Sequence, residues 1–88
     1  MKLLFCPDCQ DVFKLQKTIK SCQCGKCSGR YINNLEAVYN DGIPIGFDNT
    51  TLGMAIANQP VAGWGKKFDA FVIPKNVPTL TKTDNLED

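Results

Sequence analysis

Short apolar runs separated by turn-forming residues dominate this chain, a pattern typical of a small protein rich in β-strands. The clearest run is 68–73, where aromatic and β-branched residues precede Pro74. Residues 1–5 have a similar composition and indicate a first strand. We therefore expect a sheet of short hairpins, in which the remaining strand-like runs lie at 12–16, 18–21, 28–32, 36–39 and 43–47.

Turn signals and cysteine spacing set the expected pairing of these strands. Residues 12–16 and 18–21 are expected to form a hairpin, because the cysteines at either end of them need to converge. Asn40-Asp41-Gly42 tolerates positive φ and predicts a second hairpin between the runs on either side of it. Pro44 has no backbone N–H, so we expect it on an edge strand or in an outward-facing position.

One short helix is predicted between the last two strand-like runs. Residues 48–51 offer several N-cap candidates, and Pro60 ends the helical pattern. The apolar face of this helix over residues 52–59 consists of Leu52, Ala55, Ile56 and, at its end, Gln59.

All five cysteines lie in the first third of the chain, in two groups twelve residues apart. Two tight groups at this separation are typical of a four-cysteine zinc site, because a tetrahedral ion needs ligands that converge from two directions. Cys6, Cys9 and Cys24 are expected ligands. The fourth is Cys22 or Cys27, and the more usual C-x-x-C spacing favours Cys27.

Size, charge and cysteine use narrow the class of protein. A chain of 88 residues has a marginal core, and a structural metal is a common remedy. The odd number of cysteines and the missing signal peptide argue against disulfides, so we expect a cytoplasmic protein without a membrane span. The formal net charge is +1, with an excess of cations in residues 1–30, which gives only a weak indication of a polyanion partner.

Outside the cysteines, the segment Gly63-Trp64-Gly65-Lys66-Lys67 is the strongest candidate for a binding site. Trp64 with Lys66 and Lys67 could stack on a base and meet phosphate. The favoured interpretation, however, is that Trp64 folds back and closes the core. Arg30 beside Tyr31 is a further candidate contact, although solvation of Arg30 and packing of Tyr31 between ribbon and body are the favoured explanation of the pair. The chain contains no histidine and no nucleophile with a base, so we expect no enzyme activity and no small-molecule substrate.

Several motifs together resemble a family of small uncharacterised bacterial zinc-ribbon proteins. The resemblance covers residues 3–79 and rests on Phe5-Cys6-Pro7-x-Cys9, Ser21-Cys22-x-Cys24-Gly25-Lys26, Gly29-Arg30-Tyr31, Pro44-Ile45-Gly46-Phe47-Asp48-Asn49 and Phe68-Asp69-Ala70-Phe71-Val72-Ile73-Pro74. It implies Cys6, Cys9, Cys22 and Cys24 as ligands, with Cys27 as a bystander. The resemblance implies no activity.

The expected protein has the α+β class: a four-cysteine zinc ribbon continuous with a β-hairpin body and one short helix. We expect the ribbon at residues 1–35, the body packed on it at 36–80, and a flexible acidic tail at 81–88. The predicted function is a zinc-binding interaction module that engages a protein partner. The alternative is nucleic-acid binding through the ribbon lysines and the Trp64 loop.

Overall fold

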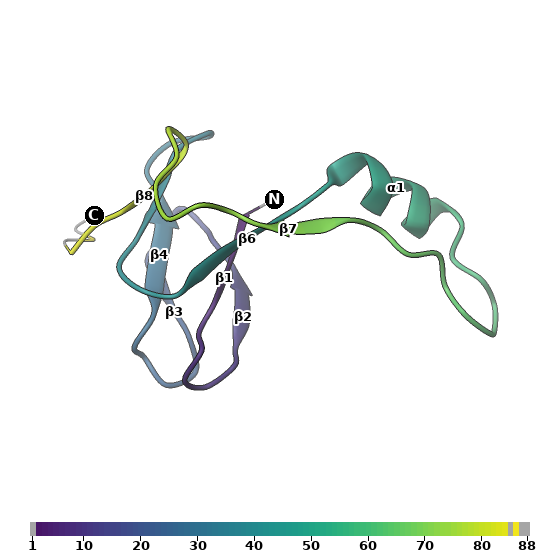
Figure 1. The fold of residues 1–88 in the computed structure, drawn as a ribbon, viewed down its shortest axis with the longest axis horizontal. Helices are drawn as coiled ribbons and strands as arrows, with labels where there is room; N and C mark the ends of the chain where they lie inside the picture. The colour runs from purple at the N-terminus through teal and green to yellow at the C-terminus, as the bar shows by residue number, and fades with distance from the viewer. Residues whose placement is uncertain (1, 85, 87–88) are drawn as a thin grey trace.

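Two small β-sheets and one helix make up the computed structural model, which describes residues 2–84 and 86 (Figure 1). This arrangement confirms the predicted α+β class. The elements of the described residues are β1 (Lys2–Phe5), β2 (Val12–Lys14), β3 (Lys20–Ser21), β4 (Ser28–Tyr31), β5 (Ala37–Tyr39), β6 (Ile43–Phe47), α1 (Asn49–Ala57), β7 (Ala70–Val72) and β8 (Leu80–Lys82).

Each sheet has four strands, and the chain crosses between the sheets more than once. The first sheet has the order β2-β1-β6-β7 and is antiparallel throughout. The second has the order β3-β4-β5-β8, in which β5 and β8 run parallel. Strands of both sheets contribute to one core, so residues on either side of position 35 share it. The core consists of Leu4, Cys6, Phe13, Leu15, Cys22, Cys27, Ala37, Tyr39 and Leu80.

Both predicted hairpins are wrong in their pairing. β2 pairs with β1, and β3 pairs with β4, so residues 15–19 cross from the first sheet to the second. The connection is fixed by Leu15, whose N–H donates to the carbonyl of Lys2, and by Gln16, whose carbonyl accepts from Tyr31. The Asn40-Asp41-Gly42 turn likewise leads from β5 in one sheet to β6 in the other. Local turn chemistry thus marked the bends correctly, but not the strands that pair across them.

Pro44 also lies where the sequence analysis did not expect it. It is buried in β6, which lies inside the first sheet between β1 and β7. The nitrogen of Pro44 falls opposite Ile73, one residue beyond the last residue of β7. The carbonyl of Pro44 accepts from the N–H of Ile73, so the Pro44 nitrogen also faces the β7 side and not β1. The missing N–H therefore removes no hydrogen bond to β1, and it lies where the pairing with β7 ends, which explains how an interior strand tolerates proline.

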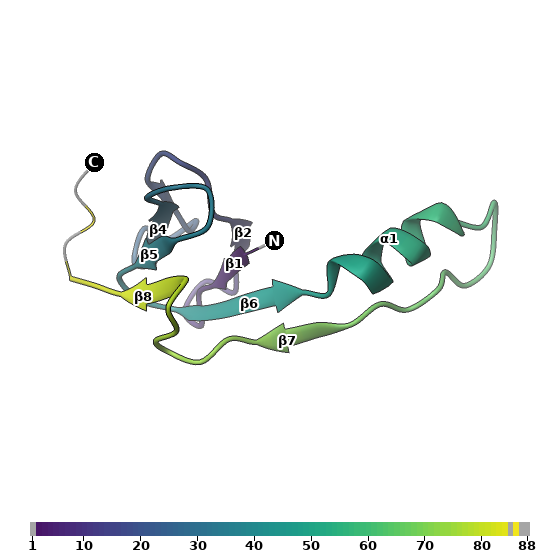
Figure 2. The ribbon, with the colours of Figure 1, turned by 90° about the horizontal axis from the view of Figure 1, so that it is seen from above.

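The helix lies at the end of a long hairpin that projects from the two sheets (Figures 1 and 2). We call residues 47–72 the arm. The N–H of Asp48 donates to the carbonyl of Asp69 (2.9 Å), and the Asp48 side chain caps α1 by accepting from Thr50 and Thr51. The ring centroids of Phe47 and Phe68 lie 5.4 Å apart in an edge-to-face contact. Asp48 is thus the N-cap among the candidates at residues 48–51, and α1 contains no buried residue.

Strand structure extends further toward the C-terminus than expected. Instead of loosening after Leu80, the chain forms β8, which runs parallel to β5 and pairs Thr81 with Val38. Leu80 is fully buried, and burial of a leucine side chain stabilises the fold by about 1.5–3 kcal/mol. Of the predicted acidic tail, residues 85, 87 and 88 lie outside the described residues.

Within the described residues, no helix is long and apolar enough to cross a lipid bilayer.

The first prediction concerns this C-terminal strand. Leu80→Ala should lower the free energy of unfolding by about 2–5 kcal/mol, because it removes a fully buried side chain from the core. Leu35→Ala is the matched control, since Leu35 is 72% exposed and its truncation should cost little. Denaturant unfolding measures both, and equal stability of the two variants would contradict a structural role for β8.

Candidate metal centre

The first cysteine pair lies in the turn between β1 and β2. Cys6 follows the last residue of β1, and both of its backbone polar groups form hydrogen bonds. Its N–H donates to the carbonyl of Asp11 (2.9 Å), and its carbonyl accepts from the N–H of Gln10 (2.7 Å). Gln10 has a positive φ of 61°, which turns the chain sharply after Cys9. The turn therefore presents both sulfurs on its inner side.

The second cysteine group lies in the turn between β3 and β4 and is built in a similar way. The N–H of Cys22 donates to the carbonyl of Cys27 (2.8 Å), and the N–H of Gly25 donates to the carbonyl of Cys22 (3.0 Å). Gly25 has a φ of 82°, a conformation that favours glycine. This tight turn places Cys22 and Cys24 toward the first pair.

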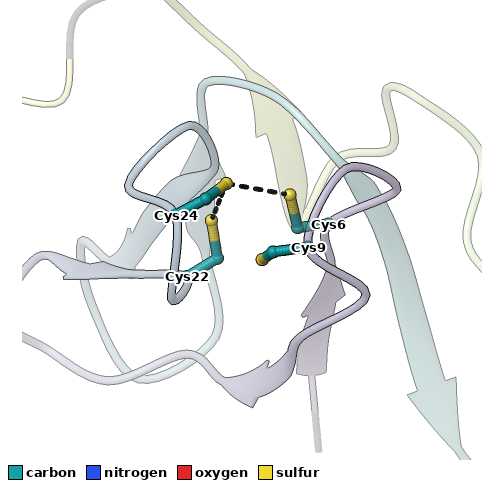
Figure 3. Close-up of side chains that lie close together, drawn as sticks. All are labelled: Cys6, Cys9, Cys22 and Cys24. Carbon is teal, nitrogen blue, oxygen red and sulfur yellow. Dashed lines mark hydrogen bonds between the residues drawn. The ribbon is translucent and has the colours of Figure 1, made fainter.

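The two turns come from different sheets and meet at one end of the molecule (Figure 1). The sulfur atoms of Cys6, Cys9, Cys22 and Cys24 all lie within 4.8 Å of one another (Figure 3). Cys6 and Cys24 are 3.7 Å apart, and Cys22 and Cys24 are 3.4 Å apart. In a tetrahedral site with metal–sulfur bonds of about 2.3 Å, neighbouring sulfurs lie roughly 3.8 Å apart. The four thiols could therefore hold a metal ion with little movement.

Backbone hydrogen bonds favour negative charge on two of these sulfurs. The N–H of Cys9 lowers the pKa of the Cys6 thiol against the opposing effect of burial. Burial acts to raise the pKa of Cys22, but hydrogen bonds from the N–H of Cys27 (3.3 Å) and from neighbouring thiols lower the pKa to about 6. Such N–H groups stabilise the thiolate form that binds metals.

The pKa of Cys24 is shifted in the opposite direction. The N–H of Lys26 acts to lower the pKa of Cys24, but hydrogen bonds with Cys22 and Cys6, together with burial, raise the pKa to about 12. Cys24 thus keeps its proton beside two sulfurs, Cys6 and Cys22, whose pKa values are lowered. A bound cation would take the place of such a proton, because metal binding to thiols releases protons.

Cys27 lies outside the group of four sulfurs. Its side chain is fully buried in the core, and burial together with a hydrogen bond to Cys6 raises the pKa of its thiol to about 12. Its backbone N–H, by contrast, points at the sulfur of Cys22. Cys27 therefore belongs to the core behind the cluster and supports Cys22 through the backbone.

Two aspartates connect the cysteine turns to each other, and the sequence analysis assigned them no role. The carboxylate of Asp8 lies 2.6 Å from the Nζ of Lys26, in an ion pair on the protein surface. The carboxylate of Asp11 accepts a hydrogen bond from the N–H of Gln23 (3.0 Å). The only signal in the sequence was their position within or just after the first cysteine pair, which does not identify a partner in the second turn.

The predicted contact residues lie in two separate parts of the fold. Arg30 is half-buried in β4, where its Nη1 donates to the carbonyl of Tyr31 (3.3 Å). Trp64, Lys66 and Lys67 lie on the arm and are exposed. Trp64 is 99% exposed, so the favoured interpretation, in which it closes the core, is wrong. The structure therefore brings the four cysteines together but does not bring Arg30 to the Trp64 loop.

Comparison with known proteins adds no further evidence on the site. No family model, curated protein or solved structure matches this chain. The interpretation of the centre therefore rests on its geometry and on the chemistry of its ligands.

The second prediction separates the two candidates for the fourth ligand. Cys22→Ser should lose most of the bound metal, because it removes a sulfur from the cluster. Cys27→Ser should retain one metal ion per chain, since the Cys27 backbone N–H that supports Cys22 is unchanged. Native mass spectrometry of both variants after purification under reducing conditions measures the stoichiometry. Metal loss in Cys27→Ser with retention in Cys22→Ser would show that the ordinary C-x-x-C spacing decides the ligand set.

Proposed function

We propose that this chain is a zinc-binding interaction module, in which zinc stabilises the fold and the arm contacts a protein partner. The observation that carries the proposal is the group of four sulfurs within 4.8 Å of one another. Four cysteine thiolates from two short turns are the usual ligands of structural zinc. The ligands in this proposal are Cys6, Cys9, Cys22 and Cys24.

A structural role fits this ligand set better than a catalytic one. Four thiolates fill a tetrahedral coordination sphere, whereas a catalytic zinc keeps one position open for water or substrate. The chain also contains no histidine, the side chain that most often serves as general base near neutral pH. We therefore propose that the module has no enzyme activity of its own.

The position of the centre explains what zinc would do for the fold. The two cysteine turns belong to different sheets, and the core that joins these sheets contains nine residues. A core of this size is marginal for a chain of 88 residues. Because an unfolded chain holds no preformed site, the free energy of zinc binding would add to the free energy of folding.

The arm is the surface that we assign to a protein partner. It carries exposed large apolar residues that make no contribution to the core, namely Met54, Ile56, Val61, Trp64, Phe68, Phe71 and Val72. Exposed apolar surface of this kind marks interaction sites in soluble proteins, and tryptophan is enriched among the residues that dominate binding energy. The arm projects away from the two sheets (Figure 2), whose turns carry the four cysteines, so a partner could bind the arm without disturbing the ligands.

Nucleic-acid binding is the second candidate function, and the full exposure of Trp64 favours it. Trp64 would stack on a base, while Lys66 and Lys67 would meet phosphates. The ribbon lysines Lys14, Lys17 and Lys20 lie on the two-sheet body rather than on the arm, and Lys26 is paired with Asp8. These separate positions weaken a common basic face, so we rank the protein partner first.

The third prediction tests the zinc. Elemental analysis of protein purified under reducing conditions should find one zinc ion per chain, and a strong chelator should unfold the two-sheet body, because the metal joins both sheets. Loss of the near-ultraviolet circular dichroism of Tyr39, which is buried in the core, reports the unfolding. Protein that contains neither zinc nor another metal and stays folded in chelator would contradict the assignment.

The fourth prediction tests the contact surface of the arm. Trp64→Ser should abolish capture of the partner from a lysate of the native host, while Leu35→Ser should leave it unchanged. Both residues are exposed, so neither substitution should alter the fold. The captured material should be protein, and treatment of the lysate with nuclease should not prevent its capture.

The same pair of variants tests the alternative by titration with labelled single-stranded RNA and DNA. Binding that is lost in Trp64→Ser and weakens steeply as salt rises would replace the protein partner by nucleic acid, because each phosphate contact contributes roughly 0.7–0.9 to the salt slope. Salt-insensitive capture of a protein would exclude that alternative.

A further inference from the structure

The outer strand β7 differs from every other outer strand among the described residues. The two sheets have four outer strands, β2, β3, β7 and β8. Three of them contain a lysine: Lys14 in β2, Lys20 in β3 and Lys82 in β8. Lysine on an edge strand hinders pairing with another sheet, and proteins commonly use it for that purpose. β7 consists of Ala70, Phe71 and Val72 alone, and therefore lacks this protection.

The backbone of β7 has hydrogen-bonding groups that face away from its own sheet. The carbonyl of Asp69 accepts from Asp48, and the N–H of Ile73 donates to Pro44. Residues 69, 71 and 73 therefore turn their backbone groups toward β6. Because these groups alternate along an antiparallel strand, the N–H and C=O of Ala70 and Val72 point outward. In the part of the chain that the structure describes, no strand pairs with this side of β7.

We propose that this edge pairs with β7 of a second copy of the chain, in antiparallel register about a two-fold axis at Phe71. In this register Ala70 of each copy lies opposite Val72 of the other, and their outward N–H and C=O groups satisfy one another. The first sheets of the two copies then form one continuous sheet. An isologous contact of this kind closes as a dimer. The outer strands of the joined sheet are then the two copies of β2, which carry Lys14.

The side chains favour the same register. Phe71 of each copy faces Phe71 of the other at a position without hydrogen bonds, where strands approach most closely and aromatic pairs contribute to stability. The ring of Phe71 lies over Gly46, where an added Cβ would come within 2.6 Å of it. The ring is therefore held in place, yet remains 55% exposed. Pro74 has no N–H and limits how far the pairing can shift along the edge.

Exposed apolar side chains lie at and beside this edge. Phe71 and Val72 in β7 are 55% and 68% exposed, and Phe68 just before the strand is 40% exposed. Exposed apolar surface of this kind marks interaction sites in soluble proteins. A second copy presents the same side chains at the same positions, so the two sides of the contact match in chemistry.

This inference rests on the proposed function only in using the arm as a contact surface, and it does not require zinc. The full chain, loaded with zinc, should elute with a light-scattering mass of twice the 9.7 kDa of one chain. Phe71→Lys and Phe71→Glu should each give the mass of one chain, because like charges then face each other at the axis. An equal mixture of the two variants should regain the doubled mass, since lysine then faces glutamate.

Val12→Lys is the matched control, because Val12 is 46% exposed on β2, the opposite edge of the same sheet; this variant should remain a dimer. Hydrogen exchange on the unaltered protein provides a test without substitutions. The amides of Ala70 and Val72 should be protected at high concentration and exchange rapidly on dilution.

Three results would overturn the proposal: a wild-type mass of one chain at every concentration, a dimer that persists in Phe71→Lys, or a variant mixture that stays monomeric while both variants are folded. The zinc content and the Trp64→Ser capture are measured separately. They would still stand if the dimer fails.

Discussion

The convergence of two cysteine turns from different β-sheets is the constraint on which this structure depends. Cys6 and Cys9 belong to the hairpin of the first sheet, and Cys22 and Cys24 to that of the second. Neither hairpin could bury enough surface to be stable alone. Joined at their turns, they enclose a small core to which β5 and β8 add Tyr39 and Leu80. The proposed metal therefore acts where the two halves of the fold meet, and the arm is free to project from them.

The sequence predicted the features that depend on neighbouring residues. The helix cap at Asp48 and the bends of the chain follow from local side-chain chemistry, which a short window contains. The pairing of β2 was missed because the cysteines were expected to flank one hairpin, whereas they lie in the turns of two hairpins, β1–β2 and β3–β4. Leu80 was missed because its partner strand is distant in sequence, and a single leucine in a polar segment gives no sign that β5 will accept it in parallel register.

For the candidate site, cysteine spacing indicated a metal but left the fourth ligand open. The structure separates Cys22 from Cys27 because the turn at Gly25 directs Cys24 back toward Cys22, whereas Cys27 enters the core as β4 begins. Trp64 could be read from sequence as a core residue or a contact residue, since glycines flank it in either case. The choice between the two roles depends on the position of the arm, which projects from the two sheets and leaves Trp64 exposed. The residues around Trp64 do not predict this projection.

The central claim is that four thiolates, and no other ligand, hold one zinc ion between the two turns. X-ray absorption spectroscopy at the zinc edge tests this most directly, because it reports the type, number and distance of the atoms bound to the ion. The account predicts a single shell of four sulfur atoms at about 2.3 Å. A shell that contains nitrogen or oxygen at about 2.0 Å would contradict it, since an open or mixed site could not serve as the closed structural junction described above.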